Sequence, residues 1–343
     1  MYKMQKILVT GGLGYIGSHV VVELQKMNFE VVIIDDLSNS SLDVLDGIIS
    51  ITDIKPWFEK IDLTEKLAVR EFFTRHLDID GVIHFAASKA VGESVTNPLK
   101  YYENNISALV NMLQELGQLD SQKLIFSSSC TVYGQADELP ITENSPIKEA
   151  ESPYGNTKIV GEQIITDCCL ANPSLRAISL RYFNPIGAHS SANIGELPIG
   201  VPQNLIPFIT QTGLGVREKL SIFGNDYPTP DGTCIRDYIH VVDLAKAHVF
   251  AIKRLLEKNN VQSPEVFNIG TGKGVSVLEV VKAFEEVSKI KLNYVFKDRR
   301  PGDVVCAFAD TNKANNILGW KSELSLKEAL ASAWKWEKRV RGK

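Results

Sequence analysis

A tyrosine and a lysine stand four residues apart in the pentapeptide that runs from Tyr154 to Lys158. If this segment is helical, the phenol and the ammonium lie on one face, because side chains at i and i+4 are neighbours on a helix. A tyrosine with an ordinary pKa of about 10 cannot accept a proton at neutral pH, but an adjacent cation favours the phenolate and lowers that pKa. The pair therefore predicts a tyrosinate base, although two such common residues also fall at this spacing on ordinary helix surfaces.

Ser129 closes an apolar run that reads as a strand, 25 residues before Tyr154. Ligands of parallel α/β folds gather at the carboxyl ends of the strands, so the serine and the tyrosine can meet there. A serine hydroxyl can hold a substrate oxygen while a tyrosinate removes its proton. Serines after strands are more often simple caps, but together with Tyr154 and Lys158 this serine predicts a catalytic triple.

A glycine-rich loop with the sequence GGLGYIG occupies residues 11–17, directly after a short apolar run and before a helical pattern. Gly11 and Gly14 allow a tight turn and a close approach to the backbone, and Gly17 allows the helix to pack on the strand. The helix N-terminus presents N–H groups and a positive dipole end to a phosphate. Isolated glycine repeats are weak evidence, but in this context the loop predicts a dinucleotide site.

Two aspartates, Asp35 and Asp36, end the second predicted strand, and Asp35 lies 24 residues beyond Gly11. A carboxylate at this place can accept hydrogen bonds from the adenine ribose and would repel a 2′-phosphate. Since no arginine is nearby, the pattern favours NAD over NADP; the alternative is that the two aspartates only start a turn. Asp62 follows a third apolar run and can bind the adenine amino group, but a single aspartate there is as often a turn former.

The elements that must carry these residues alternate between short β-branched runs and longer amphipathic segments, which is typical of βα units on a parallel sheet. Predicted strands cover residues 6–10, 30–34, 81–85, 123–127 and 176–181, and predicted helices cover 18–26, 66–75, 101–116, 154–169 and 241–256. The pattern predicts an α/β fold with a doubly wound parallel sheet of the Rossmann type.

The sequence changes character after residue 184, where glycine and proline become frequent and long segments lack periodicity. Long loops in a compact enzyme usually cover a ligand. We therefore expect an NAD-binding domain over residues 1–184, rejoined by a helix within 237–260, and a smaller C-terminal α/β substrate-binding domain over 185–343.

The composition suits a soluble globular protein of 343 residues, with 44% hydrophobic residues and a formal net charge of −4. The weakly acidic balance offers no field for nucleic acid, and no apolar run reaches the roughly 18 residues of a membrane span. The apolar run at residues 7–9 is too short for a signal peptide. The five cysteines form neither a disulfide framework nor a CxxC spacing, and no histidines pair at i, i+4, so we expect reduced thiols, a cytoplasmic location and no metal.

The loop GxxGxxG at residues 11–17 and the set Ser129, Tyr154 and Lys158 resemble the extended short-chain dehydrogenase/reductase superfamily. More specific segments are similar to the UDP-glucose 4-epimerase family, and this resemblance covers essentially the whole chain. These segments are VTGG at 9–12, GYIGSH at 14–19, KAVGES at 89–94, RYFNP at 181–185 and RDYIHV at 236–241.

This resemblance implies a reversible oxidation at one carbon of a nucleotide sugar. In the family the tyrosinate deprotonates the C4 hydroxyl, hydride passes to tightly held NAD, and the planar 4-keto sugar turns before hydride returns to its other face. UDP-glucose and UDP-galactose are thereby interconverted, and no external redox partner is consumed. Carried over to this chain, Ser129 and Tyr154 act on O4, and Lys158 binds the nicotinamide ribose while lowering the tyrosine pKa.

The resemblance also implies two sets of binding residues. The cofactor set lines NAD and comprises Gly11, Gly14, Tyr15, Ile16, Gly17, Asp35, Asp36, Leu37, Asn39, Ser40, Asp62, Leu63, Phe85, Ala86, Ala87, Lys89, Asn104, Ser129, Tyr154, Lys158 and Phe183. The substrate set holds the UDP-sugar and comprises Lys89, Ser129, Tyr154, Asn184, Asn204, Leu205, Ser221, Ile222, Phe223, Arg236, Arg300, Asp303 and Ala307. Two arginines suit a diphosphate, since each guanidinium offers a planar fork of donors; for Arg300 a surface salt bridge is the alternative.

Three other functions stay open at this point. Nucleotide-sugar dehydratases of the superfamily resemble one another in carrying an acid, often an Asp-Glu pair, just after the serine, because expelling water needs an acid and a base. This chain has Cys130 and Thr131 there, which disfavours elimination. A non-catalytic NAD-sensing protein of the same fold is the second alternative, but it need not keep the catalytic triple. A net oxidoreductase is the third.

Sugar breadth and assembly are also expected from the family. Its sugar pocket is bordered by the position four residues after the aspartate of Arg-x-Gly-Asp, where tyrosine restricts the sugar and a small residue admits a 2-acetamido group. Here that position is Ala307, so we expect UDP-GlcNAc and UDP-GalNAc to be accepted as well, unless Phe308 refills the space. Family members commonly pair as homodimers through two helices, here over residues 101–116 and 152–169, and the chain indicates no other partner.

Overall fold

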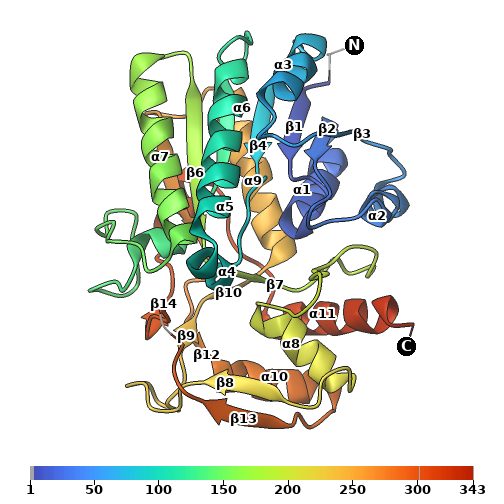
Figure 1. The fold of residues 1–343 in the computed structure, drawn as a ribbon, viewed down its shortest axis with the longest axis vertical. Coiled ribbons are helices and arrows are strands. Elements are labelled where there is room, and N and C mark those ends of the chain that lie inside the picture. Colours follow the sequence, from blue (N-terminus) through green and yellow to red (C-terminus); the bar gives the residue numbers. More distant parts are fainter. Residues whose placement is uncertain (1–3, 301, 343) are drawn as a thin grey trace.

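One seven-stranded sheet forms the centre of the computed structural model, which describes residues 4–300 and 302–342 (Figure 1). Its strands are all parallel and lie in the order β11-β6-β5-β4-β1-β2-β3. Their bounds are β1 Lys6–Thr10, β2 Glu30–Asp35, β3 Trp57–Lys60, β4 Gly81–His84, β5 Lys123–Ser129, β6 Arg176–Tyr182 and β11 Glu265–Ile269. The predicted doubly wound parallel sheet is confirmed.

The inner strands are continuous apolar runs because helices cover both faces of the sheet. In β1, Ile7 and Val9 enter one apolar layer while Leu8 enters the other, as the alternation of a strand requires. The first layer is covered by α1 Tyr15–Lys26, α2 Asp43–Thr52 and α9 Val241–Leu256, and the second by α3 Lys66–Arg75, α6 Ala108–Leu116 and α7 Pro153–Ala171.

All five predicted strands are present, but two strands of the sheet and one of the helices that cover it were missed. β3 is a short edge strand whose Trp57 is 59% exposed, so it lacks the apolar run that marks a buried strand. β11 joins the sheet beside β6 only after a long excursion of the chain. The missed helix is α2, and the predicted helix over 101–116 is in fact divided, with α5 Pro98–Tyr102 and α6 joined by a π-helical turn at Glu103–Ser107.

Smaller elements gather beside the sheet, at the bottom of the view in Figure 1. A third apolar cluster joins α8, α10 and α11 to a parallel pair of strands, β8 and β13. The bounds are α8 Leu205–Gly213, β8 Leu220–Phe223, α10 Val277–Ser288, β13 Tyr294–Lys297 and α11 Leu326–Val340. The remaining elements are α4 Val91–Thr96, a 3-10 turn at Cys130–Tyr133, β7 Asn184–Ile186, β9 Ile235–Arg236, β10 Tyr238–His240, β12 Val275–Ser276, β14 Cys306–Ala307 and a π-helical turn at Ala314–Leu318.

The division into two domains at residue 184 stays a prediction. The helix α9 packs on α1, and beyond it β11 extends the central sheet past the predicted return segment 237–260. Leu318 and Trp320 also lie in the apolar layer of α1 and α9. The chain thus returns to the sheet more than once. Within residues 4–300 and 302–342, no helix combines the length and apolar character needed to span a bilayer.

Candidate active site

The sheet reverses its winding between β1 and β4, which lie side by side with β2 on one flank and β5 on the other. Such a reversal opens a crevice at the carboxyl ends of the two strands. Gly11 follows β1 and Phe85 follows β4, and a Cβ on Gly11 would lie only 2.9 Å from the backbone nitrogen of Ala86. The two loops that begin the crevice are therefore in close contact.

The glycine loop has the geometry expected of a phosphate cradle. Gly11 has a φ of +69°, in the left-handed region that favours glycine. A Cβ on Gly17 would stand 2.2 Å from the carbonyl oxygen of Gly11, so no side chain fits there. The loop passes through Gly14 into α1, whose first residue is Tyr15. These close approaches leave the N-terminus of α1 open to a phosphate.

Asp35 is buried at the end of β2 and ties two loops together. Its Oδ2 accepts a hydrogen bond from Leu13 N at 3.0 Å, and its Oδ1 accepts from Leu37 N at 3.0 Å and from Ser40 Oγ at 2.7 Å. The carboxylate thus orients the glycine loop and the loop after β2. The turn-forming alternative accounts for Asp36, whose Oδ1 accepts from the backbone N–H and hydroxyl of Ser38.

Other members of the predicted cofactor set are placed in varied ways. Asp62 accepts from the backbone N–H and hydroxyl of Thr64 at 2.8 and 2.7 Å, as a turn former does. Asn39 is exposed, whereas Leu63 is 4% exposed and packs in the second apolar layer. The Phe85 ring lies 4.7 Å from the ring of His248 on α9. Ile16, Ala86 and Ala87 are half-buried, and Phe183 is buried.

The catalytic triple comes together where α7 begins beside the end of β5. Ser152 caps this helix by accepting from Gly155 N at 3.2 Å, so Tyr154 and Lys158 occupy successive turns. Lys158 Nζ lies 5.8 Å from the centre of the Tyr154 ring and donates a hydrogen bond of 2.6 Å to the carbonyl oxygen of Ser127. Ser129 ends β5 and hydrogen-bonds with Tyr154.

Burial dominates the electrostatics of this triple. Desolvation raises the pKa of Tyr154, and the hydrogen bond with Ser129 acts in the opposite direction without cancelling it. Desolvation also lowers the pKa of Lys158 to about 8, while Glu162 opposes that change. Desolvation therefore outweighs any lowering of the tyrosine pKa by Lys158 in this structure, because loss of solvent disfavours both charged forms at once.

A buried ion pair lies beneath the triple. Arg181 on β6 donates to Glu162 on α7 through Nε at 2.9 Å and Nη2 at 2.5 Å, and through Nη1 to the Tyr133 hydroxyl at 2.9 Å. Glu162 also accepts from the Ser128 hydroxyl. The pair therefore joins the helix of Lys158 to the ends of two strands. Neither residue was predicted from the sequence, although Glu162 stands one turn beyond Lys158 on the same helix face.

A second missed residue, Asn105, connects α7 to the loop after β4. Its side chain accepts from Ser88 N at 2.8 Å and donates to Ser88 O and to Thr157 Oγ1, both at 3.0 Å. The neighbouring Asn104, a predicted cofactor residue, donates to Ser88 Oγ at 3.3 Å. Both asparagines belong to the π-helical turn, which presents them to the same loop.

Lys89 of the same loop reaches the substrate side of the crevice through Glu196. Lys89 Nζ lies 5.7 Å from the centre of the Tyr15 ring and 3.4 Å from Glu196 Oε1. Asn204, which precedes Leu205 at the start of α8, donates to the same oxygen at 2.5 Å. Glu196 thus joins residues of the two predicted sets, and the sequence analysis did not identify it.

The predicted sugar-nucleotide residues converge from separate segments. Asp303 accepts from Arg300 Nε at 2.9 Å and lies 3.9 Å from Arg236 Nη2, so one carboxylate stands beside both guanidinium groups. Arg300 also covers the ring of Phe223 at 4.8 Å, in the strand that carries Ser221 and Ile222. Arg300 therefore does form an ion pair, as the alternative held, but its partner connects it to Arg236.

Ala307 and Asn184 complete this side of the crevice. Ala307 is 6% exposed and stands opposite Arg236 in the register of β14 and β9. It packs in a small apolar cluster with Phe183. Asn184 follows directly in β7, and its backbone N–H donates to Asp237 O at 2.9 Å.

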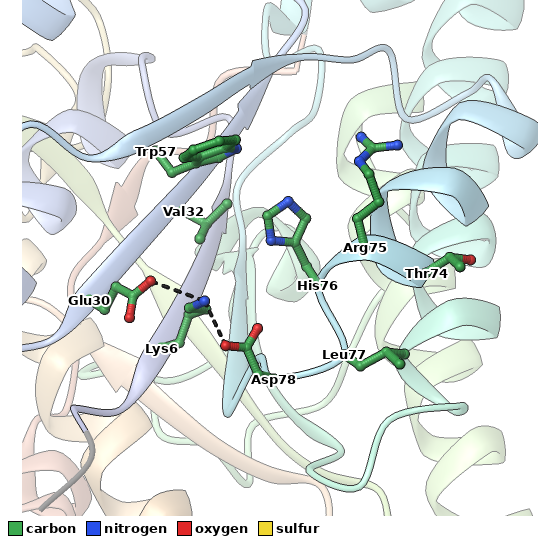
Figure 2. A pocket seen from close by; sticks show the side chains of 9 residues that line it. All are labelled: Lys6, Glu30, Val32, Trp57, Thr74, Arg75, His76, Leu77 and Asp78. Carbon is green, nitrogen blue, oxygen red and sulfur yellow. Dashed lines mark hydrogen bonds and ion pairs between the residues drawn. The ribbon is translucent and has the colours of Figure 1, made fainter.

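A separate cavity of about 570 Å³ lies at the amino ends of the strands, far from these groups along β1 and β2 (Figure 2). Lys6 and Glu30, the first residues of those strands, line it together with Trp57, His76 and Asp78. Lys6 Nζ is already paired with Glu30 at 3.0 Å and with Asp78 at 2.7 Å. Ligands of such sheets bind at the opposite edge, so we assign no site here. In the described part of the chain, no His, Cys, Asp and Glu side chains cluster so as to hold a metal ion.

Comparisons with known proteins agree with this geometry. The NAD dependent epimerase/dehydratase family matches residues 7–270. A UDP-glucose 4-epimerase of Bacillus subtilis (strain 168) is 49% identical over 331 residues, 96% of this chain and 96% of that protein. The crystal structure of a UDP-glucose 4-epimerase from Bifidobacterium longum in complex with NAD+ and UDP is 42% identical, with a TM-score of 0.94 over 98% of this chain and 99% of that one. A UDP-Glc/GlcNAc 4-epimerase from Campylobacter jejuni is 37% identical, with a TM-score of 0.84 over 98% and 99%.

Proposed function

The chain belongs to the NAD dependent epimerase/dehydratase family, and we propose that it interconverts UDP-glucose and UDP-galactose as a UDP-glucose 4-epimerase. One observation supports this proposal most directly: Tyr154 is hydrogen-bonded to Ser129 and lies one helical turn from Lys158, at the carboxyl end of β5, and the glycine loop follows the carboxyl end of β1 in the same parallel sheet. A base so placed can reach a hydroxyl of a sugar whose diphosphate is held by arginine.

The residues present fit NAD. The close approach of Gly17 to Gly11 and the buried Asp35 form the cradle that a dinucleotide needs, and the carboxylate has no arginine beside it to bind a 2′-phosphate. When bound, NAD supplies the acceptor of the C4 hydride and then its donor. The protein holds the 4-hydroxyl through Ser129, takes its proton at the Tyr154 oxygen, and keeps the Lys158 cation near that oxygen.

Two observations favour epimerisation over the alternatives. A dehydratase needs a general acid after the serine, but burial raises the pKa of the Cys130 thiol there to about 12. A non-catalytic NAD sensor has no need for the buried pair of Glu162 and Arg181, which braces the segments of the triple. A net oxidoreductase would accumulate NADH in proportion to its product, and an assay of total NADH distinguishes it from an epimerase.

The assay uses purified protein with its bound NAD and UDP-galactose. We expect UDP-glucose to form with no change in total NADH, because the hydride returns to the sugar. Stoichiometric accumulation of NADH would contradict the proposal. Tyr154→Phe should keep its NAD and lose at least about a hundredfold in kcat, since the phenolic oxygen is the base. An undiminished rate in that variant would remove Tyr154 from the mechanism.

We propose further that the N-acetylated sugars UDP-GlcNAc and UDP-GalNAc are accepted. The small side chain of Ala307 supports this proposal, since it lies on the face of its strand that it shares with Arg236, whereas Phe308 lies on the other face against Gly274. Ala307→Tyr should lower the rate with UDP-GalNAc at least about tenfold and spare that with UDP-galactose. Equal losses with both sugars would count against this role.

Assembly and location are proposals of the same kind. A homodimer through α6 and α7 would have twice the 38.0 kDa mass of one chain, which light scattering measures. A cytoplasmic location is supported by five free cysteines, and fractionation of cells that make the tagged protein would test it.

A further inference from the structure

Asp237 is a fully buried carboxylate at the point where β9 passes into β10. Its Oδ1 accepts from the backbone N–H of Thr271 at 2.8 Å and from the hydroxyl of Thr271 at 2.6 Å. Its Oδ2 accepts from the backbone N–H of Gly272 at 3.0 Å and of Ala309 at 3.2 Å. The four hydrogen bonds hold the loop after β11 and the segment after β14 against one side chain.

The surroundings of the Asp237 carboxylate are buried and closely packed. Burial raises the pKa of Asp237, and the bonds from Thr271, Ala309 and Gly272 oppose that rise. A Cβ on Gly270 would stand 2.4 Å from Asp237 Oδ2, so the adjoining loop must have glycine there. An ionised carboxylate in such surroundings is costly unless hydrogen-bonded, which indicates that the group orders the segments around it.

The backbone of Asp237 connects the segments that carry the predicted substrate set. Its N–H donates to Ala307 O at 3.0 Å, and its carbonyl oxygen accepts from Asn184 N at 2.9 Å. Arg236 precedes it and pairs with Ala307 in the strand register. Asn184, Arg236 and Ala307 come from three distant parts of the sequence, and this one residue joins all three.

We propose that Asp237 is a positioning residue for the nucleotide-sugar site, whose carboxylate fixes the junction from which Arg236 and Asn184 reach the UDP-sugar. This role rests on the proposed function, because it assigns those two residues to substrate. Within residues 4–300 and 302–342, the hydrogen-bond partners of Asp237 lie in neither the glycine loop nor α7. Its loss should therefore weaken binding of the sugar nucleotide more than binding of NAD or the rate at saturation.

Asp243 provides a matched control for a merely structural role. It is equally buried, burial raises its pKa, and its Oδ2 accepts from Glu323 N at 2.9 Å and Leu324 N at 2.7 Å. It holds the start of α9 to a segment outside the substrate set. Asp243→Asn should lower Tm while leaving UDP affinity and kcat within about threefold of the unaltered protein.

The experiment measures UDP binding by calorimetry and epimerisation of UDP-galactose, both on protein with bound NAD. Asp237→Asn replaces one carboxylate oxygen by an amide NH₂. This group faces N–H donors and cannot accept their hydrogen bonds. We expect the Kd for UDP and the KM for UDP-galactose to rise at least about tenfold, with kcat and NAD content within about threefold. An unchanged Kd, or equal losses of UDP and NAD binding, would overturn the positioning role.

A milder variant keeps the test decisive if Asp237→Asn does not fold. Thr271→Val removes the hydroxyl that donates to Asp237 at 2.6 Å and accepts from Lys273 N at 3.2 Å, and it keeps the other three hydrogen bonds to the carboxylate. We expect the Kd for UDP to rise about threefold without loss of NAD. No change in its Kd would overturn the proposal in that case. The proposed function fails separately: a protein that binds UDP but does not epimerise would sink that function, and the UDP titrations of the variants would still decide the role of Asp237.

Discussion

Lys158 is placed where its surroundings disfavour its own charge. The side chain is 5% exposed, its Nζ lies 5.0 Å from the centre of the Phe126 ring, and it donates to Ser127 O. Desolvation lowers its pKa from 10.5 to about 8, and Glu162 limits the change. A lysine shifted this far titrates within the range in which folded protein can be studied.

We predict that this titration appears in the stability of the protein. Between about pH 8 and 10.5 the folded state has released the Lys158 proton while the unfolded state still holds it, so the free energy of unfolding gains a contribution that increases with pH. Its slope is about 1 kcal/mol per pH unit. Urea unfolding at pH 7.5, 8.5 and 9.5 should show it in the unaltered protein and not in Lys158→Met.

Other groups titrate equally in both proteins, so the difference between them isolates Lys158. Two stability curves that stay parallel from pH 7.5 to 9.5 would show that the lysine is not desolvated as described.

Residue types and spacings predicted the groups that we propose act on substrate but not the groups that hold them in place. Tyr154 and Lys158 are recognisable because helix periodicity alone makes them neighbours. Glu196 pairs with Lys89 and Asp237 bonds to Ala307, partners far away in the sequence that only the fold brings close. The direction of the Tyr154 pKa shift was missed for the same reason, since burial is a property of the folded chain.

Among the elements, the turn from β1 into α1 leaves no room for side chains at two of its glycines. The Gly17 position touches the Gly11 carbonyl, and the Gly11 position touches the loop after β4. Bulk at either position must push strand, loop or helix apart, because each of these contacts is with backbone.

We predict that Gly17→Ala loses most of its bound NAD, with affinity reduced at least about a hundredfold, since its methyl group would stand 2.2 Å from the Gly11 oxygen. Gly117→Ala is the matched control, because its Cβ would meet nothing closer than 3.4 Å, at the C-terminal end of α6. NAD content, read from absorbance after denaturation, should fall only in the first variant. Equal NAD in both would show that the loop tolerates the methyl group.

Element prediction succeeded where burial is continuous and failed where it is not. The inner residues of β1 and β2 are all apolar because both faces are covered, so their sequences alone identify these strands. β3 has one open edge, and β11 is recognisable as a sheet strand only from its pairing with β6.

Over the whole molecule, the C-terminal third completes the core that the N-terminal half begins. Phe267 and Ile269 of β11 are fully buried, and Leu318 and Trp320 fill the same layer against α1 and α9. Each such side chain contributes about 1.5–3 kcal/mol by burial. Together they are comparable with the 5–15 kcal/mol that stabilises a typical protein.

We predict that a chain ending at residue 260 does not fold, because it lacks β11 and the two later core residues and leaves β6 as an open edge. Circular dichroism and thermal melting should show no cooperative transition for it. A chain ending at residue 340 keeps every described helix and strand and should melt like the full chain. A cooperative transition in the shorter chain would mean that the first 260 residues fold alone.

The π-helical turn at Glu103–Ser107 makes the number of residues between α5 and α6 as important for the structure as the side chains there. Such a turn holds one residue more than the α-helix would. Before this turn, the hydroxyl of Tyr101 accepts a hydrogen bond from Ala90 N. After it, Leu109 and Met112 fill the core. Deleting one residue would restore a regular helix, but it would rotate α5 relative to α6 by about 100° around the helix axis. Either Asn104 and Asn105 would turn away from the loop after β4, or Leu109 and Met112 would leave the core. We therefore expect no single deletion in this turn to be neutral.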